Sequence, residues 1–536
     1  AVSLHQYITN PQEEAQAIKG LMFTQSLGGS IASAMVNLTQ PIAVTFPYLS
    51  QFGGAAKAAK QMTSALADAA KWETTSNPKL RTTGDKALDA AMRKAEEDGI
   101  VSPQETHNLI AQAGGKGALK SGDGTLAGNL AATGSNFMSK VMLGWGRPFA
   151  VAEQFNRRAT YIAAYRTAVE QGMADPSGFA EKAIAETQFT YNKANRPQWA
   201  RGAVGSTLFI FKQYSISYVE LMTRMARSGP EGRKAAALGL AVLFLMAGLQ
   251  GLPGADDLDD IIDGALQRMG YNWNSKQQKR ELLASLVGDG GAMFLMRGLS
   301  GLPGAPIDVS GRLGIGNLIP GTGLLTKKED YSRDALEILG PAGSFAQQIG
   351  KGAGKLAEGE PIAAIKSILP VAAANMVKSA DMASTGMYRD DRGRKVTDTD
   401  GIDAAFKAIG FQPNDVARVQ RATGEVQSMI AQTKIRESEI ADKWARGMFE
   451  KDADLVKEAR EELARWNESN PATRIAISSA QIVKRLQSMR QDKTQRLAKT
   501  APKEIRATVR RLLEGVQWLG DRPLPRSASL PRRWPG

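Results

Sequence analysis

The sequence of 536 residues contains no cysteine and only two histidines, His5 and His107, which stand far apart. The absence of cysteine excludes disulfide scaffolds, thiolate zinc sites, iron–sulfur clusters and cysteine nucleophiles. Two isolated histidines leave almost no material for a histidine-rich metal site or a Ser–His–Asp triad. Most familiar catalytic chemistries are therefore excluded before any motif is considered.

Charge is also missing over a long N-terminal stretch. No Asp, Glu, Lys or Arg occurs from Gly20 to Ala56. Pro41 and Pro47 interrupt this stretch, so it predicts a buried helix, a proline bend and a second short element. The first residues lack a basic leader and an apolar run, so we expect no signal peptide. Ala1 is compatible with loss of an initiator Met and equally with a piece of a longer polypeptide.

The rest of the composition is that of a folded protein, with 43% apolar and 23% charged residues. The patterns predict a mainly α, multi-helix chain, elongated or oligomeric, with Gly/Pro-rich loops and a basic C-terminal tail. Five regions follow from composition: an apolar helical segment (1–75), small helices with a Gly-rich linker (76–135), a helical core (136–345), a second helical region (346–471), and basic helices with a Pro/Arg-rich tail (472–536).

The positive charge is concentrated at the C-terminal end. The chain carries a net charge of +14, and residues 472–536 hold 15 basic against four acidic side chains. Such a tail is attracted to nucleic acid, anionic lipid or an acidic partner, although a solvated end is the alternative. We expect folding to survive deletion of residues 472–536. The residues predicted to contact phosphate are Arg485, Arg490, Arg496, Arg506, Arg510 and Arg511.

The most polarised stretch lies between a basic flank and an acidic flank. Fifteen uncharged residues run from Ala235 to Leu249, and the uncharged run continues to Ala255. Because a membrane-spanning helix needs about 20 residues, the run is either a buried helix of a bundle or a segment that enters a bilayer. The predicted membrane-interacting residues are Leu238, Leu240, Val242, Leu243, Phe244, Leu245, Met246 and Leu249.

The end of this run is repeated. GLQGLPGADDLDD from Gly248 recurs as GLSGLPGAPIDVS from Gly298. Each copy joins an apolar stretch to a Gly-Leu-Pro-Gly turn and then to acidic residues, which predicts a repeated helix–turn unit.

Other segments give simpler predictions. Seven glycines between Gly114 and Gly134 indicate a flexible loop, and YRDDRGRKVTDTDG from Tyr388 indicates a charged loop. The Arg/Lys/Glu-rich stretch from 403 to 467 predicts solvent-facing helices, supported by the pairs Glu439–Lys443 and Lys457–Glu461. The aromatic and Met stripe that includes Tyr218, Leu221, Met222 and Met225 predicts a core face.

No catalytic or metal site emerges from the motifs. Gly314–Pro320 and Gly316–Thr322 resemble a dinucleotide loop and a phosphate loop, but the first lacks its third glycine and the second its lysine. The acids at 256, 257, 259 and 260 lack calcium-loop spacing and predict a helix N-terminus. Glu153 and Glu186 could be considered as the pair of carboxylates that glycoside cleavage needs, but no motif distinguishes them from the other acids. We predict no enzyme activity, no catalytic residue, no metal and no cofactor.

The central block resembles a known family. The phrases that carry the resemblance are AEQFNRRATYIAAYR, ETQFTYNKANRPQWARG, LFIFKQYSISYVELMTRM and DVSGRLGIGNLIPGTGLL, with NLTQPIAVTFPYL upstream. They cover most of Asn37 to Leu325. As a set they resemble the large polyvalent protein-associated domain of podophage internal virion, or ejection, proteins.

The resemblance implies a protein held in the capsid interior and delivered to the host cell envelope, where it helps form a conduit for the genome. Implied partners are further copies of the chain, other ejection proteins, portal and tail components, the host inner membrane, and double-stranded DNA through its phosphates. The resemblance supplies no catalytic residues. Two alternatives remain: a DNA-binding virion component, and a fragment of a cell-wall-degrading ejection enzyme.

Overall fold

The computed structural model describes residues 29–102, 126–189, 212–319, 322–326, 369–390 and 393–490, with a few isolated residues besides; for 126–145 it describes the backbone alone. The predicted mainly helical fold is confirmed. Two compact units are present. The larger unit comprises the chain up to Ala265 and Trp273–Gln427, and the smaller unit comprises Leu266–Asn272 and the chain from Ser428. The five-part division by composition stays a prediction.

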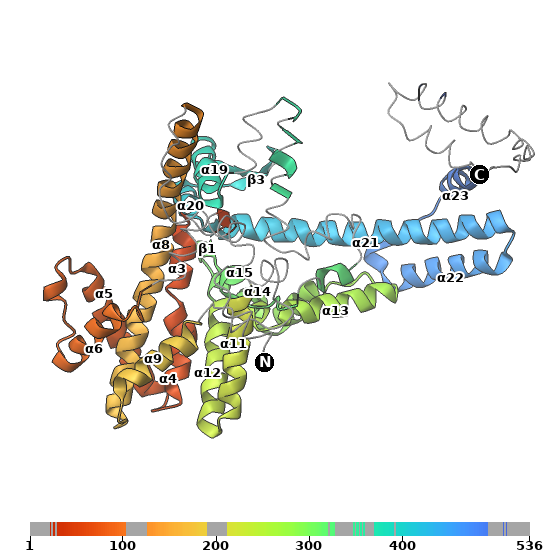
Figure 1. Ribbon diagram of the computed structural model, residues 1–536. Helices are drawn as coiled ribbons and strands as arrows, with labels where there is room; N and C mark the ends of the chain where they lie inside the picture. The colour runs from red at the N-terminus through yellow and green to blue at the C-terminus, as the bar shows by residue number, and fades with distance from the viewer. Residues whose placement is uncertain are drawn as a thin grey trace, which may run out of the picture. The chain divides into compact units, whose positions relative to one another are not determined.

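The first half of the larger unit is a helical bundle built around its longest helix, α8 (Figure 1). Against α8 pack α3, α5, α6 and α9. The predicted helix, proline bend and second element at the N-terminus are confirmed as α3, a π-helical turn (Pro41–Thr45) and α4. The helices of this bundle are α3 (Ile31–Asn37), α4 (Phe46–Ser50), α5 (Ala55–Thr74), α6 (Lys86–Glu97), α8 (Leu126–Glu170) and α9 (Pro176–Thr187).

The start of α8 corrects the predicted Gly-rich loop. Residues 126–134 are helical rather than flexible, and the rest of the Gly114–Gly134 segment lies mostly outside the described residues. The sequence LAGNLAA from Leu126 supplies three alanines and two leucines, which favour a helix strongly enough to outweigh one glycine.

A deeply placed arginine ties the bundle together. Arg158 of α8 is 4% exposed. Its guanidinium pairs with Glu73 of α5 and, at 2.8 Å, with Glu96 of α6. The two carboxylates and their hydrogen bonds compensate the buried charge. The contact joins α8 to the two consecutive helices α5 and α6.

The bundle continues into a helical hairpin formed by α11 (Gln213–Arg227) and α12 (Pro230–Ala247). The predicted core stripe is confirmed, since Tyr218, Leu221, Met222 and Met225 are buried. The Tyr218 hydroxyl donates to the carbonyl of Gly239 at 3.0 Å. A Cβ at Gly239 would come within 2.8 Å of Met222 Sδ, so the glycine allows the two helices to approach closely.

The second half of the larger unit surrounds two short antiparallel ladders. In the first, Ile307 lies opposite Pro413 and Asp308 lies opposite Gln412. The elements of this second half are α13 (Ala255–Arg268, whose end lies in the smaller unit), α14 (Ser275–Arg297), β1 (Ile307–Asp308), α15 (Ser310–Leu313), α19 (Val371–Thr385), β2 (Met387–Arg389), β3 (Lys395–Asp398), α20 (Gly401–Ile409) and β4 (Gln412–Pro413).

The second ladder corrects the predicted charged loop at 388–401. Strands β2 and β3 form a hairpin with an irregularity between Tyr388 and Arg389. Gly393, at φ +77°, allows the chain to reverse, and the Asp390 carboxylate accepts the Arg394 backbone N–H at 2.9 Å. Charged residues at the turn hid the strands, although Tyr388 and Val396 pack into a small apolar cluster.

The smaller unit is a long helical hairpin. It is formed by the second part of α21 (Asn414–Glu450) and by α22 (Ala453–Ser469), and α23 (Ser479–Arg490) follows them in the chain (Figure 1). The predicted polar helices are confirmed. Lys457 and Glu461 pair at 3.9 Å, whereas Lys443 pairs across the hairpin with Glu458 and Glu462, and Glu439 pairs with Arg436.

The core of the smaller unit includes residues from the predicted tail. Ile475 and Ile482 are each 5% exposed, and Ile475 packs with Ile440 and Trp466. The Trp466 indole N–H donates to the Thr473 carbonyl at 3.0 Å. Our expectation that folding survives loss of residues 472–536 therefore needs correction, because that deletion removes part of this core.

Candidate functional site

Seven of the eight predicted membrane-interacting residues lie on α12, a helix with one buried face, and Leu249 lies in the 3-10 turn that follows it. Helix α12 ends at Ala247, where Gly248 leaves the helical region with φ +72°. Leu243 and Met246 are buried in the core, and Leu240 and Leu245 are exposed. The remaining members, Leu238, Val242, Phe244 and Leu249, are half-buried. Insertion of this segment into a bilayer stays a prediction.

A different segment has the length and composition of a membrane span. Among the described residues, one helical stretch, Ser275–Gly301, is long and apolar enough, and only 22% of its apolar window is buried. Three of its apolar side chains stand out in solvent: Leu282 (62% exposed), Leu286 (71%) and Val287 (53%). Sequence reasoning missed this stretch because Asp289 and the glycines beside it interrupt the apolar run.

The candidate span is bent at Gly288. This residue has φ +75° and ψ 166°, which lies outside the helical region. The bend divides α14 into segments of 13 and nine residues, which at about 1.5 Å per residue are about 20 Å and 14 Å long. Neither part alone reaches the roughly 30 Å of a bilayer hydrocarbon core. The bent helix therefore presents apolar side chains without being a span.

The two copies of the repeated sequence meet at their glycines. Helices α12 and α14 end immediately before Gly248 and Gly298, and a 3-10 turn follows each helix. A Cβ at Gly248 would lie 2.2 Å from the Arg297 backbone nitrogen, and one at Gly298 would lie 2.4 Å from the Leu245 carbonyl oxygen. The predicted helix–turn unit is confirmed, and its two copies contact each other through backbone.

The acidic residues after the first copy begin a helix, as predicted. Asp256 and Asp257 lie in the first turn of α13. The Asp257 carboxylate accepts backbone N–H groups from Leu318 (2.6 Å) and Ile319 (3.1 Å) and the Thr322 hydroxyl (2.9 Å). The glycine-rich segment that resembles a phosphate loop thus holds the chain's own carboxylate. Within the described residues, no group of His, Asp and Glu could hold a metal ion.

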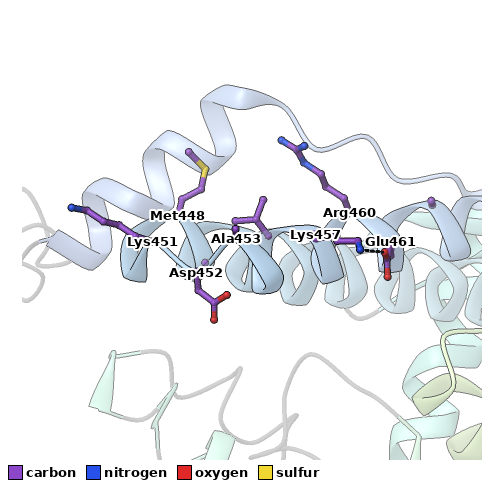
Figure 2. A pocket seen from close by; sticks show the side chains of 10 residues that line it. Met448, Lys451, Asp452, Ala453, Lys457, Arg460 and Glu461 are labelled. Carbon is purple, nitrogen blue, oxygen red and sulfur yellow. Dashed lines mark ion pairs between the residues drawn. The ribbon is translucent and has the colours of Figure 1, made fainter.

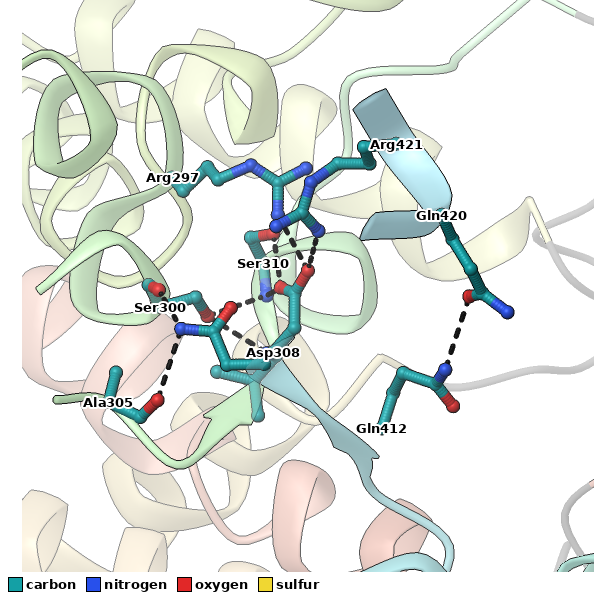
Figure 3. Close-up of polar contacts among 10 residues, drawn as sticks. Arg297, Ser300, Ala305, Asp308, Ser310, Gln412, Gln420 and Arg421 are labelled. Atoms are coloured by element: carbon teal, nitrogen blue, oxygen red, sulfur yellow. Dashed lines mark hydrogen bonds and ion pairs between the residues drawn. The ribbon is translucent and has the colours of Figure 1, made fainter. Parts of the chain in front are cut away.

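The densest polar cluster surrounds Asp308, beside the β1–β4 ladder (Figure 3). Its carboxylate pairs with Arg421 of α21 and, at 2.6 Å, with Arg297 of α14. It also accepts the Ser310 backbone N–H (3.0 Å) and hydroxyl (2.7 Å). The Asn414 amide donates to the carbonyls of Ser300 and Ala305 in the same cluster.

Charge imbalance perturbs the titration of this cluster. Burial alone would raise the pKa of Asp308, but the Ser310 hydrogen bond and the charges of Arg297 and Arg421 lower that pKa to about 2. Burial and the neighbouring Arg297 lower the pKa of Arg421 to about 10. The cluster contains two guanidinium groups for one carboxylate, which suits a structural tie better than acid–base catalysis.

The six arginines predicted to bind phosphate differ in their partners and in whether the structure describes them. Arg485 pairs with Asp442 and donates to the Ser438 hydroxyl at 3.2 Å, so part of its charge is satisfied within the smaller unit. Arg490 is the last residue of α23, and Arg511 is exposed. Arg496, Arg506 and Arg510 lie outside the described residues.

A pocket of about 610 Å³ lies on the hairpin of the smaller unit (Figure 2). Its lining combines apolar residues with three basic and two acidic side chains. Arg460 lies 4.9 Å from the Trp444 ring centroid, and Lys457 is paired with Glu461. None of its ten lining residues is a Ser, Thr or His. The lining residues are Gly447, Met448, Lys451, Asp452, Ala453, Val456, Lys457, Arg460, Glu461 and Ala464.

The two acids considered as a hydrolytic pair are held by arginines. Glu153 pairs with Arg157 at 3.1 Å, and Glu186 pairs with Arg224 at 2.6 Å. These contacts give both carboxylates a structural role, in α8 and between α9 and α11.

No known protein family, curated protein or solved structure matches this chain. Function must therefore be inferred from the residues themselves.

Proposed function

We propose that this chain is an internal virion protein of a phage, which is packaged in the capsid and helps form a conduit through the host cell envelope. The observation that carries the proposal is the exposed apolar part of α14, centred on Leu282, Leu286 and Val287. A protein that stays in water gains nothing from exposing neighbouring large apolar side chains, whereas one that later meets a membrane buries them there.

The bend at Gly288 fits a protein with a packaged state and a delivered state. If Gly288 adopts helical dihedral angles, Ser275–Arg297 becomes one continuous helix of 23 residues, about 35 Å long and sufficient to cross a bilayer. The contact between Gly248 and Gly298 ties the C-terminal end of α14 to α12. In the proposed insertion, α12 and α14 would meet the host inner membrane as a pair.

The partners of the conduit follow from the same proposal. A single pair of helices cannot enclose a channel for DNA, so the conduit needs further copies of the chain, together with other ejection proteins and portal or tail components. Small residues at the α11–α12 and α12–α14 contacts show how closely its helices can pack.

Liposome flotation and dye release test the proposal with the full chain. Wild-type protein and the double variant Leu282→Asp, Leu286→Asp are mixed with dye-filled vesicles of host-like lipid composition. Both substituted side chains are exposed, so the variant should fold. We expect wild type to float with the vesicles and release dye, and the variant to do neither.

A matched control replaces two exposed apolar residues elsewhere, Leu80→Asp and Ile402→Asp, which are 69% and 64% exposed. This control should float and release dye like wild type. Wild-type protein that leaves vesicles intact and unbound would overturn the membrane role. Equal losses in the control and the α14 variant would attribute flotation to charge rather than to α14.

A second candidate function, DNA binding in the virion, is favoured by the charge of the tail. Residues 491–536 carry eleven basic and four acidic side chains. Contacts of that kind go to phosphates, so they are insensitive to base sequence and weaken as salt rises.

A further inference from the structure

Two lysines approach the same buried tyrosine in the larger unit. Tyr388 of β2 is 9% exposed. The Lys378 ammonium of α19 lies 4.7 Å from the centre of its ring, and the Lys407 ammonium of α20 lies 5.8 Å from it. A cation gains from one aromatic ring, but a second cation at the same ring adds repulsion between like charges.

A third cation, Arg312, also affects the charge of Lys407. Arg312 of α15 donates to the Gly410 carbonyl at 2.6 Å and lies 5.9 Å from the Phe411 ring centroid. Burial first, and then the charges of Lys378 and Arg312, lower the pKa of Lys407 to about 8. The ionisable groups that act on Lys407 are therefore both positive.

The carboxylates of the surrounding described elements have partners other than these two lysines. Asp400 and Asp403 form the capping box of α20. The others are paired with cations of their own: Asp381 with Arg389, Asp390 with Arg394, Asp398 with Lys395, Asp415 with Arg418, and Asp308 with Arg297 and Arg421. Within the part of the chain that the structure describes, none of these carboxylates pairs with Lys378 or Lys407.

The two ammonium groups have unused hydrogen-bond donors. Lys407 donates to the Gln412 side-chain oxygen at 2.8 Å, which occupies one of its three N–H bonds. Lys378 has only the Tyr388 ring as a partner among the described residues. A doubly charged oxyanion in contact with both lysines would accept these N–H bonds and reduce the repulsion, and a phosphate group has the required charge near neutral pH.

We propose that Lys378 and Lys407, beside Tyr388, bind one phosphate group, either as free phosphate or as part of a lipid headgroup. The residues of the site belong neither to α14 nor to residues 491–536, and the proposal holds whether or not the chain forms a conduit. Like-charge repulsion in the unliganded protein also makes a prediction about folding: the variants Lys378→Gln and Lys407→Gln should be no less stable than wild type in the absence of phosphate.

Calorimetric titration of the full chain with inorganic phosphate, at constant ionic strength set with sodium chloride, tests the site. We expect saturable binding by wild type and at least tenfold weaker binding by Lys378→Gln and by Lys407→Gln. The control Lys395→Gln removes a lysine from β3 that is paired with Asp398, and should bind as wild type does. Thermal unfolding of each variant without phosphate separates loss of the site from loss of the fold.

The source of the phosphate is decided with vesicles of phosphatidylcholine containing 30% phosphatidic acid, whose phosphomonoester headgroup can carry two negative charges. Weaker flotation of Lys378→Gln would identify the lipid headgroup, and unchanged flotation would identify free phosphate. The Leu282→Asp, Leu286→Asp variant should still bind inorganic phosphate, so failure of the membrane role leaves this site measurable. Absence of saturable phosphate binding by wild type, or an equal loss in Lys395→Gln, would overturn the proposal.

Discussion

Asp308 is the shared carboxylate partner of two arginines beside the β1–β4 ladder. It lies between Arg297 and Arg421 with its side chain 12% exposed. We expect Asp308→Asn to lower the free energy of unfolding by on the order of 3 kcal/mol, because two partly buried guanidinium groups then lose their counter-charge. Urea denaturation measures this.

The control for Asp308 is an exposed ion pair of the same type. Asp398 is 79% exposed and pairs with Lys395, so Asp398→Asn should change the free energy of unfolding by less than about 1 kcal/mol. Similar effects at the two positions would show that the Asp308 cluster is no more than a surface contact.

The pH dependence of stability follows from the same carboxylate. The pKa of Asp308 falls from an ordinary 3.8 to about 2 in the folded protein, through the Ser310 hydrogen bond and the two arginines acting against burial. Its contribution, about 2 kcal/mol, is therefore complete above about pH 5 and is lost as the pH falls through 4 towards 2. Unfolding of wild type and Asp308→Asn, compared between pH 7 and pH 2, should show the gap closing only below about pH 5.

At the scale of elements, the repeated Gly-Leu turns determine how α12 and α14 cross. A Cβ at Gly298 would lie within 2.4–2.7 Å of backbone atoms of Leu245, Met246 and Ala247. We expect Gly298→Ala to destabilise the larger unit by at least about 2 kcal/mol more than Gly304→Ala. Gly304 has a similar positive φ of +77° but no neighbouring atom within 4 Å, so its substitution reports backbone strain alone. Urea denaturation measures the free energy of unfolding of both variants. Equal destabilisation by the two substitutions would show that close packing at Gly298 contributes nothing.

The turn between α21 and α22 contains a lysine in an unfavourable conformation. Lys451 has φ +61°, while the following Asp452 caps α22 by accepting the N–H groups of Asp454 and Leu455. Glycine adopts this conformation without strain, so Lys451→Gly should stabilise the smaller unit by about 1 kcal/mol. Lys457→Gly, within α22, should do the reverse by a similar amount. Thermal unfolding measures both, and stabilisation by both or neither would contradict the assignment.

At the scale of the whole molecule, Ile475 and Ile482 of the basic C-terminal region belong to the core of the smaller unit. Truncation after Arg490 should keep the hairpin folded, because Ile475 and Ile482 remain in its core. Truncation after residue 471 should expose Trp466 and lower the melting temperature of the smaller unit. Circular dichroism melts and limited proteolysis distinguish the two chains.

The same truncation tests the tail's affinity for DNA. The chain ending at Arg490 should bind duplex DNA at least tenfold more weakly than the full chain, and the salt dependence of the remaining binding should be shallower. Unchanged affinity would place any DNA contact outside residues 491–536.

Much of the helical architecture was predictable from local pattern. The core stripe on α11 followed from apolar spacing. The turns at Gly248 and Gly298 were visible as a repeat, and so was the acidic start of α13. These features depend on neighbours in the sequence, and for that reason composition and spacing were sufficient to predict them.

The partners of the charged groups were decided only by tertiary structure. Nothing local to Asp308 indicates two arginines from 11 and 113 residues away, and nothing near Arg485 indicates Asp442. The two lysines at Tyr388 were missed for the same reason, whereas the exposed leucines of α14 were missed because Asp289 and the glycines beside it interrupt the apolar run. Sequence determined which segments are helical and where charge is plentiful. Folding decided which charges are neutralised and which apolar faces are covered, because both depend on contacts between residues far apart in the chain.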